Sequence, residues 1–155
     1  MPTEEKDVLS LECVIFMGIQ ASGKSSFYKE HFFSTHMRIN LDMLKTRYRE
    51  NIYLNASIDA KQPFVVDNTN PTAEERQKYI EIAKRHRFKT IGYYFEPDYD
   101  ESIRRNARRS GKACIPEKGI RSVLGKLEVP QYTEGFDELY IVRSYEGSFQ
   151  VDRLD

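Results

Sequence analysis

Short apolar runs that alternate with helical patterns are the feature that most narrows the possible folds of this chain. The runs are rich in β-branched and aromatic residues, which is typical of buried strands. We expect strands at residues 11–17, 37–40, 64–67, 88–95 and 138–142, and a short one at 149–151. We expect helices at 24–33, 41–60, 72–85, 98–109 and 116–126, the third starting at a capping-box spacing. Strands separated by such helices predict βαβ units and a mostly parallel sheet.

Length and composition favour one globular domain. The 155 residues are enough for one ordinary core, so we expect a single domain over 1–155. Lys plus Arg and Asp plus Glu each total 24, which excludes a uniformly basic nucleic-acid coat. No apolar run approaches the ~18 residues of a membrane span, so we expect no membrane partner. The polar, acidic start of the chain is unlike a secretory signal, and we expect a cytoplasmic protein.

The two cysteines exclude another class of small protein. Cys13 and Cys114 are too few for a disulfide framework or a four-thiolate zinc site. In parallel sheets, ligands bind beyond the carboxyl ends of the strands. Gly18 and Asp67 fall at such ends, as do the residues after Asn40 and Phe95. Any chemistry is therefore expected at these four places.

The segment from Gly18 to Ser25 has the spacing G-x-x-x-x-G-K-S, between an apolar strand and a helix. Glycines let such a loop fold around a phosphate chain, so that its N–H groups and the helix N-terminus converge on the anion. Lys24 is expected to reach the β and γ phosphates, and the Ser25 hydroxyl to bind Mg²⁺. The pattern predicts a site for ATP and Mg²⁺. Its candidate binding residues are Gly18, Gln20, Ala21, Ser22, Gly23, Lys24, Ser25 and Ser26.

Asp67 is a candidate second metal ligand. It ends an apolar strand, where a carboxylate of P-loop proteins holds the magnesium directly or through water. An Asx turn is the alternative, because Asp-Asn commonly closes a strand in this way. The neighbouring phosphate loop makes the metal hypothesis the better one.

Asp42 is a candidate general base. It follows the short run at 37–40, and if that run is a strand, the carboxylate lies on the ligand side near Lys24. Such a carboxylate can accept the proton of an attacking hydroxyl. Alternatively, Asp42 merely occupies the first turn of a helix, where the helix dipole favours it.

A cluster of cations precedes a flexible break at Ser110 and Gly111. It comprises Arg104, Arg105, Arg108, Arg109 and Lys112. One interpretation is a solvated helix end, where cations favour the dipole. The other is a lid at about 105–116 that places Arg105 and Arg109 on a transferring phosphoryl group. We favour the lid, conditional on the phosphate loop.

Four segments occur in one order at compatible spacings: residues 18–25, Asn40–Asp42, the D-N-T-N-P run at 67–71, and the R-N-x-x-R run at 105–109. Together they resemble the kinase domain of 5′-hydroxyl polynucleotide kinases, within the wider P-loop kinase group. The resemblance covers about residues 11–145. It implies a single-domain α/β P-loop NTPase fold with a mostly parallel five-stranded sheet flanked by helices. It also implies a general base at Asp42, and Arg105 and Arg109 in an arginine-bearing lid over the ATP phosphates.

The chain departs from this family at two positions near the expected acceptor. The family often has a basic residue just before the base, where this chain has Leu41, and Lys45 replaces an arginine one turn later. A lysine cannot make the planar, two-pronged contact of an arginine. Both departures fall on the acceptor side and leave the donor side intact. The whole pattern predicts an ATP- and Mg²⁺-dependent transfer to a hydroxyl, most like that of a polynucleotide 5′ end. A small-molecule kinase and a non-catalytic ATP-binding module remain alternatives, and the sequence shows no oligomeric state.

Overall fold

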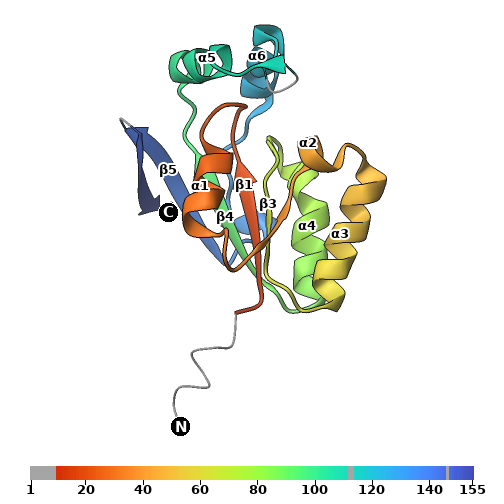
Figure 1. The fold of residues 1–155 in the computed structure, drawn as a ribbon. Helices are drawn as coiled ribbons and strands as arrows, with labels where there is room; N and C mark the ends of the chain where they lie inside the picture. The colour runs from red at the N-terminus through yellow and green to blue at the C-terminus, as the bar shows by residue number, and fades with distance from the viewer. Residues whose placement is uncertain (1–9, 112–113, 146) are drawn as a thin grey trace.

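A six-stranded sheet forms the centre of the chain (Figure 1). The computed structural model describes residues 10–111, 114–145 and 147–155. The strand order is β2-β3-β1-β4-β5-β6. The first five strands are parallel, and β6 runs antiparallel to β5. The strands are β1 (Glu12–Met17), β2 (Met37–Ile39), β3 (Phe64–Val66), β4 (Lys89–Phe95), β5 (Glu138–Tyr145) and β6 (Ser148–Arg153).

This architecture confirms the α/β fold predicted from the sequence. The five parallel strands implied by the family resemblance are present, and the short tail strand expected at 149–151 becomes the sixth. The sheet is therefore one strand wider than the resemblance implied. The helices are α1 (Lys24–His31), α2 (Leu41–Leu44), α3 (Arg47–Asp59), α4 (Ala73–Arg85), α5 (Tyr99–Ala107) and α6 (Glu117–Lys126), with a 3-10 turn η2 (Tyr132–Glu134).

Helices cover both faces of the central strand β1. Cys13, Ile15 and Met17 pack in one cluster with apolar side chains of α3 and α4. Val14 and Phe16 point the other way and pack with side chains of α1. All five of these residues are fully buried. A strand that is covered on both faces needs apolar residues at every position. This explains why the apolar residues of β1 are consecutive in the sequence and do not alternate with polar ones.

The prediction of a single helix at 41–60 is wrong in one respect. The structure divides it into α2 and α3 at Lys45, whose φ of 75° lies outside the helical region. Each part has its own cap: Asn40 Oδ1 accepts from the Met43 amide at 2.9 Å, and Thr46 Oγ1 accepts from the Arg49 amide at 3.1 Å. The one-turn helix α2 carries Asp42 at the carboxyl end of β2.

Helices α5 and α6 lie beyond the carboxyl ends of the strands, above the loop that follows β1 (Figure 1). Asp98 caps α5 by accepting from the Glu101 amide at 3.1 Å. The helix ends at Ala107, two residues before the expected end, and Gly111 has a left-handed φ of 58°. Lys112 lies outside the described residues. We use the name lid segment for the described residues 97–111 and 114–126, which include those of the lid predicted at about 105–116; that such a lid closes stays a prediction.

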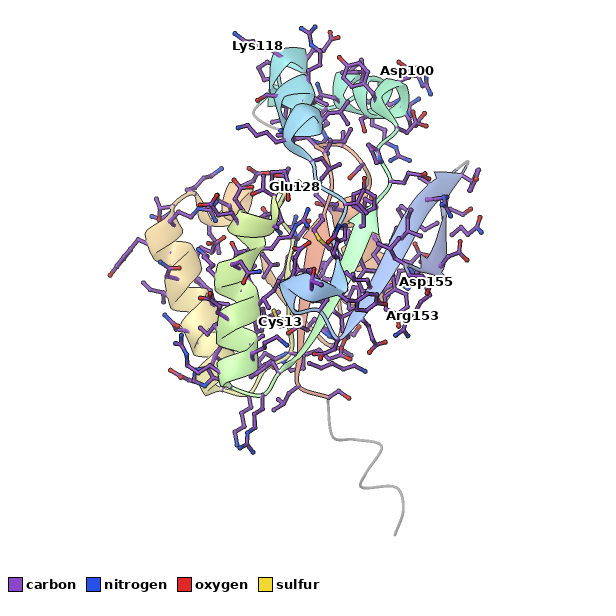
Figure 2. All side chains as sticks on the ribbon, turned by 180° about the vertical axis from the view of Figure 1, so that it is seen from behind. Cys13, Asp100, Lys118, Glu128, Arg153 and Asp155 are labelled. Atoms are coloured by element: carbon purple, nitrogen blue, oxygen red, sulfur yellow. The ribbon has the colours of Figure 1, made fainter. Side chains whose placement is uncertain are left out.

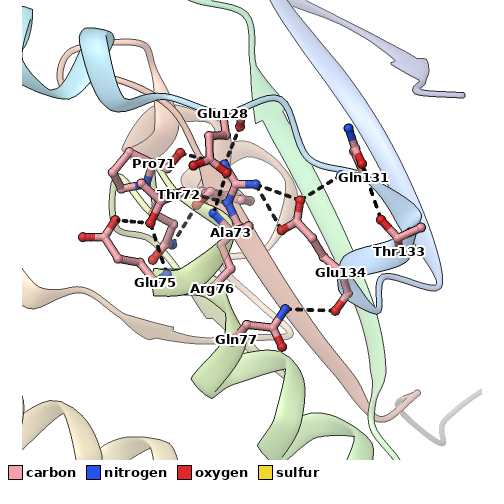
Figure 3. A network of polar contacts seen from close by, with 12 residues as sticks. Pro71, Thr72, Ala73, Glu75, Arg76, Gln77, Glu128, Gln131, Thr133 and Glu134 are labelled. Atoms are coloured by element: carbon pink, nitrogen blue, oxygen red, sulfur yellow. Dashed lines mark hydrogen bonds and ion pairs between the residues drawn. The ribbon is translucent and has the colours of Figure 1, made fainter.

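The chain returns from the lid segment to the sheet beside Glu128, just below α6 (Figure 2). A polar network around Arg76 holds this return (Figure 3). The fully buried Arg76 side chain donates to the carbonyl oxygens of Asn70 at 2.9 Å and of Pro71 at 3.0 Å, and also to the Glu128 carbonyl. It pairs with the Glu134 carboxylate at 3.1 Å. Arg76 thus joins the segment after β3 to the segment after α6.

Candidate active site

The loop from Gly18 to Ser25 joins β1 to α1 at the carboxyl edge of the sheet. Lys24 Nζ donates to the carbonyl oxygens of Gly18 at 3.0 Å and Ile19 at 2.7 Å, which folds the loop around its ammonium group. Gly23 has a φ of 98°, a conformation that side chains disfavour. A Cβ atom there would also lie 2.9 Å from the Phe149 ring. Glycine is therefore required at this point for two separate reasons.

Lys24 is a buried cation within the loop. Burial lowers the pKa of its ammonium group to about 8, while the carboxylates of Asp67 and Asp42 act in the opposite direction and Arg109 acts with burial. All three of these sequence-predicted residues line one cavity together with Lys24. A desolvated ammonium beside a loop of main-chain amides favours a polyanionic ligand.

Ser25 and Asp67 meet at the start of α1. The Ser25 hydroxyl donates to Asp67 Oδ2 at 3.4 Å, although 42 positions separate the two residues. Asp67 is 2% exposed, and its Oδ2 also accepts from Arg38 Nε at 2.8 Å. Its side-chain partners thus come from α1 and β2. Arg38 Nη2 donates to the Ser25 hydroxyl at 2.9 Å.

These two side chains fit a magnesium ion. Mg²⁺ prefers hard oxygen ligands, and in nucleotide sites it takes one or two from the protein and the others from phosphates and water. A hydroxyl and a buried carboxylate provide that set, and the carboxylate already holds a cation, Arg38, at the same oxygen. Among the residues that the structure describes, no group of three or more His, Cys, Asp or Glu side chains offers a competing metal site.

The D-N-T-N-P run after β3 connects several parts of the site. Asn68 Oδ1 accepts from the Leu41 amide at 2.8 Å, which fixes the start of α2 next to Asp42. The Thr69 carbonyl accepts from the Gly18 amide at 3.0 Å. Asn70 Nδ2 donates to the Phe16 carbonyl at 2.8 Å. Three consecutive residues of the run thus anchor three different neighbours, and the side-chain contacts of Asn68 and Asn70 give a physical reason for the two asparagines.

Glu50 accepts a hydrogen bond from the Asn68 side chain and so helps to fix its position. The sequence analysis did not identify Glu50. This fully buried carboxylate accepts from Asn68 at 3.0 Å, Lys78 at 2.7 Å and the Tyr79 hydroxyl at 3.1 Å. Burial raises the pKa of Glu50, but the hydrogen bonds from Lys78 and Arg47 outweigh burial and hold the pKa below its ordinary value. Glu50 reads in sequence as an ordinary first-turn acid of α3, so no local signal identifies it.

A cavity of about 760 Å³ opens between the phosphate loop and α2. Asp42 lies in its wall together with Lys24 and Ser25, on the side of the sheet where the sequence analysis expected it, and its role as a base stays a prediction. Its other polar lining includes Gln20, Arg38, Lys45, Asp67 and Arg109. Among the described residues, Gln20 is one of three with a buried side-chain oxygen that has no hydrogen-bond partner, and it belongs to the lining of this cavity. We call this space the α2 cavity.

A second cavity of about 410 Å³ lies on the other side of the loop. Gly23, Ser26 and Arg105 line it together with Ser144 of β5 and Phe149 of β6. Arg105 Nη2 donates to the Ser144 hydroxyl at 2.6 Å. The sequence analysis did not single out Ser144 or Phe149, because only the β5–β6 hairpin brings them to the loop. We call this space the β6 cavity.

The lid segment reaches both cavities through the R-N-x-x-R run. Arg109 lines the α2 cavity and the β6 cavity. Asn106 Oδ1 accepts from the Ile115 amide at 2.7 Å, and Asn106 Nδ2 donates to the Ile115 carbonyl. Ile115 in turn lines the α2 cavity. Asn106 thus closes the loop that follows α5 and gives the asparagine of the run a structural role.

The parallel sheet of order 2-3-1-4-5, the glycine-bounded loop after β1 and the arginine-bearing segment define a P-loop kinase domain. The chain matches the AAA domain family AAA_33 over residues 51–130, just over half of its length. It therefore belongs to that family. The matched region begins within α3, so the phosphate loop adds independent support.

Curated relatives are bifunctional enzymes. The chain is 28% identical over 132 residues to the bifunctional polynucleotide phosphatase/kinase of Schizosaccharomyces pombe, covering 81% of this chain and 32% of that protein. It is 26% identical over 151 residues to a putative bifunctional polynucleotide phosphatase/kinase of Acanthamoeba polyphaga mimivirus, covering 93% of this chain and 35% of that protein. The chain thus spans about a third of the length of these relatives.

Solved structures share the fold. A gluconokinase from Sinorhizobium meliloti superposes with a TM-score of 0.58 at 20% identity, over 85% of this chain and 82% of that one. Chaetomium thermophilum Kti12, solved with ADP-AlF3, gives a TM-score of 0.60 at 14% identity, over 84% and 88%. Within the described residues, no helix has the length and apolar character needed to cross a membrane.

Proposed function

We propose that this domain transfers the γ-phosphoryl group of ATP to a hydroxyl, and that the acceptor is the 5′-hydroxyl end of a polynucleotide. The observation that carries the proposal is the α2 cavity, in which Lys24 and Ser25 of the loop face Asp42 of α2 across one space. A phosphate-binding loop and a carboxylate across a shared cavity are the parts that phosphoryl transfer needs.

The donor occupies the loop and the β6 cavity in this proposal. The amides of residues 18–26 and the Lys24 ammonium bind the triphosphate. Phe149 and Ser144 line the space beside Gly23, where the nucleoside extends from the loop. Kti12, which shares the fold, was solved with a nucleotide complex. Arg105 and Arg109 border this space and reach the phosphates from the lid segment.

The acceptor lies in the α2 cavity with its hydroxyl at Asp42. The Asp42 carboxylate accepts the hydroxyl proton as the new oxygen–phosphorus bond forms. The bond between the γ-phosphorus and the bridging oxygen breaks, and ADP leaves with that electron pair. The fixed positive charges of Lys24 and Arg109 stabilise the negative charge on the moving phosphoryl group, and neither side chain transfers a proton. Ser25 and Asp67 would hold Mg²⁺, which neutralises charge across the β and γ phosphates when bound.

The choice of a polynucleotide acceptor rests on the curated relatives and on the charge of the α2 cavity. Both relatives are named as polynucleotide phosphatase/kinases, and the chain matches about a third of each. Arg38 and Lys45 line the cavity although Leu41 and Lys45 depart from the family pattern. Arg38 of β2 thus adds a guanidinium to the wall of this cavity.

A γ-phosphate transfer screen tests this proposal. Radiolabelled ATP is offered with 5′-hydroxyl RNA, 5′-hydroxyl DNA, nucleosides and sugars, using the Lys24→Ala variant as the control. We expect transfer to the polynucleotides by the wild type, a steep fall with rising salt, and none by the variant. Tight ATP binding with no transfer to any hydroxyl would contradict the proposal and favour a nucleotide-binding module.

A small-molecule kinase is the second candidate function. It is favoured by the apolar side chains of Leu41 and Met43 in the cavity wall and by the formal net charge of zero. Transfer to a neutral nucleoside or sugar with little salt dependence would select it, because no phosphates of the acceptor would then be neutralised.

A further inference from the structure

Arg38 links the proposed metal site to the α2 cavity, and no sequence motif predicts it. From β2, its Nε atom donates to Asp67 Oδ2 at 2.8 Å, and its Nη2 atom donates to the Ser25 hydroxyl at 2.9 Å. These are the two oxygen atoms that fit Mg²⁺. The guanidinium therefore holds the same pair of ligands that the metal needs.

A cation at this position has a physical cause. The Asp67 side chain is 2% exposed, and a buried carboxylate without a partner charge is strongly disfavoured. The Arg38 side chain is 27% exposed, and its guanidinium carbon lies 5.9 Å from the centre of the Tyr28 ring. The buried carboxylate is thus paired with a cation whose side chain is partly exposed and lines the α2 cavity.

Direct binding of Mg²⁺ to both oxygen atoms would compete with Arg38. Mg²⁺ binds its ligands at about 2.0–2.1 Å in a near-ideal octahedron and brings its own waters. The guanidinium that donates to Asp67 Oδ2 and Ser25 Oγ lies beside both ligand atoms, where the shell of a directly bound metal would form. Binding of the metal through both ligands therefore has to displace the Arg38 side chain.

The space available to a displaced guanidinium is the α2 cavity. Arg38 already lines that cavity together with Asp42 and Lys45. Its backbone is held in the sheet by the parallel pairing of Arg38 with Val65, so only the side chain needs to move. An arginine presents a planar fork that suits a phosphate group.

We propose that Arg38 is the resident counter-ion of the metal site and that Mg²⁺-nucleotide releases it into the α2 cavity, where it binds a phosphate next to the acceptor hydroxyl. The inference rests on the proposed function for its acceptor half. It makes donor and acceptor binding cooperative, because the guanidinium can turn its Nε and Nη2 donors to an acceptor phosphate only after the metal has taken Asp67. Such a coupling is reciprocal between the two ligands.

The proposal has a metal half, the displacement of Arg38 by Mg²⁺-nucleotide, and an acceptor half, the binding of an acceptor phosphate by the released side chain. The metal half is tested by calorimetry with ADP, which has no γ-phosphoryl group to transfer. The measured quantity is the ratio of the ADP dissociation constants in EDTA and in Mg²⁺, for the wild type and for Arg38→Gln. We expect the variant to raise this ratio about five-fold or more, because the metal no longer displaces a cation. Arg85→Gln removes an exposed arginine of α4 and should leave the ratio unchanged. A ratio in Arg38→Gln at or below that of the wild type would overturn the proposal.

A second variant covers the case in which Arg38→Gln does not fold. Arg38→Lys keeps a cation beside Asp67 but cannot bind Asp67 and Ser25 with one planar group. We expect its ratio to lie above that of the wild type, with a melting temperature close to that of the wild type. A ratio equal to or lower than the wild-type value would again refute the counter-ion role.

The acceptor half is tested with a 5′-hydroxyl dinucleotide, which has one phosphodiester, and with the matching nucleoside, which has none. In the wild type, Mg²⁺-ADP should tighten dinucleotide binding about five-fold or more and leave the nucleoside unaffected. In Arg38→Gln this gain should vanish, and its persistence would overturn the acceptor half. If the wild type neither binds nor phosphorylates the dinucleotide, both the acceptor half and the proposed function are overturned. The ratio of the ADP dissociation constants in EDTA and in Mg²⁺ tests the counter-ion role of Arg38 independently of that result.

Discussion

Replacing Arg76 by alanine tests how the lid segment is attached to the sheet. The fully buried Arg76 side chain donates to the carbonyls of Asn70, Pro71 and Glu128 and pairs with Glu134, whose side chain is 9% exposed. The variant leaves these carbonyls and a nearly buried carboxylate without their partner. Removing one member of a buried ion pair costs about 3–5 kcal/mol.

That cost is a large part of the total stability of a domain, which is about 5–15 kcal/mol. For a chain of this size, roughly 2–4 °C of melting temperature is lost per kcal/mol, so we expect a fall of about 6–20 °C. Thermal unfolding followed by circular dichroism measures it. The matched control is Arg85→Ala, which removes an exposed arginine from the same helix and should change the melting temperature little.

A double-mutant cycle with Glu134→Gln separates the ion pair from the carbonyl contacts. Amide exchange adds a local measurement, because the Glu128 amide donates to the Pro71 carbonyl at 2.7 Å beside the Arg76 side chain. We expect its protection to fall more in Arg76→Ala than that of the β1 amides. A melting temperature within about 2 °C of the Arg85→Ala control would refute the reasoning, since the network would then contribute no net stability.

Three further predictions concern the candidate site. Asp42→Asn should retain ATP binding in calorimetry and lower the rate of transfer about 10²–10⁴-fold, and a near wild-type rate would show that the base is elsewhere. Arg109→Ala should lower turnover by a larger factor than it changes the folding equilibrium measured by thermal unfolding, whereas an unchanged turnover with a lower melting temperature would mean a structural role. Glu50 has a lowered pKa, so its contribution is present above about pH 4.5 and is lost as the pH falls through the folded value. Glu50→Gln should therefore flatten the loss of stability in acid unfolding, and an unchanged acid profile would count against that pKa direction.

Local patterns predicted most of the helices and strands because their causes are local. The capping contact of Thr72 with the Glu75 amide, at 3.2 Å, begins α4 where the spacing indicated. The strand β1 was recognisable because burial on both faces demands a continuous apolar run. The helix expected at 41–60 was too long because Lys45 adopts a positive φ without being glycine. Periodicity alone contains no signal for such a break.

The sequence analysis missed these residues of the site for a common physical reason. Arg38 occupies an ordinary polar position on a short strand, and its importance arises only because β2 pairs with β3 and so faces Asp67. Phe149 reaches Gly23 only because the chain turns back as β6 along β5. Both contacts depend on strand order, which hydrophobic spacing does not encode.

The sequence by itself determined the phosphate loop, since its geometry depends on eight consecutive residues, on glycine at Gly23 and on the strand and helix that flank it. Tertiary structure alone decided which side chains meet that loop. Arg38 from β2, Asp67 from the end of β3 and Ser144 from β5 lie near it because the parallel strands on both sides of β1 end at the same edge of the sheet as the loop. The loop is a short-range property of the backbone, whereas its surroundings are long-range contacts that exist only once the sheet has assembled.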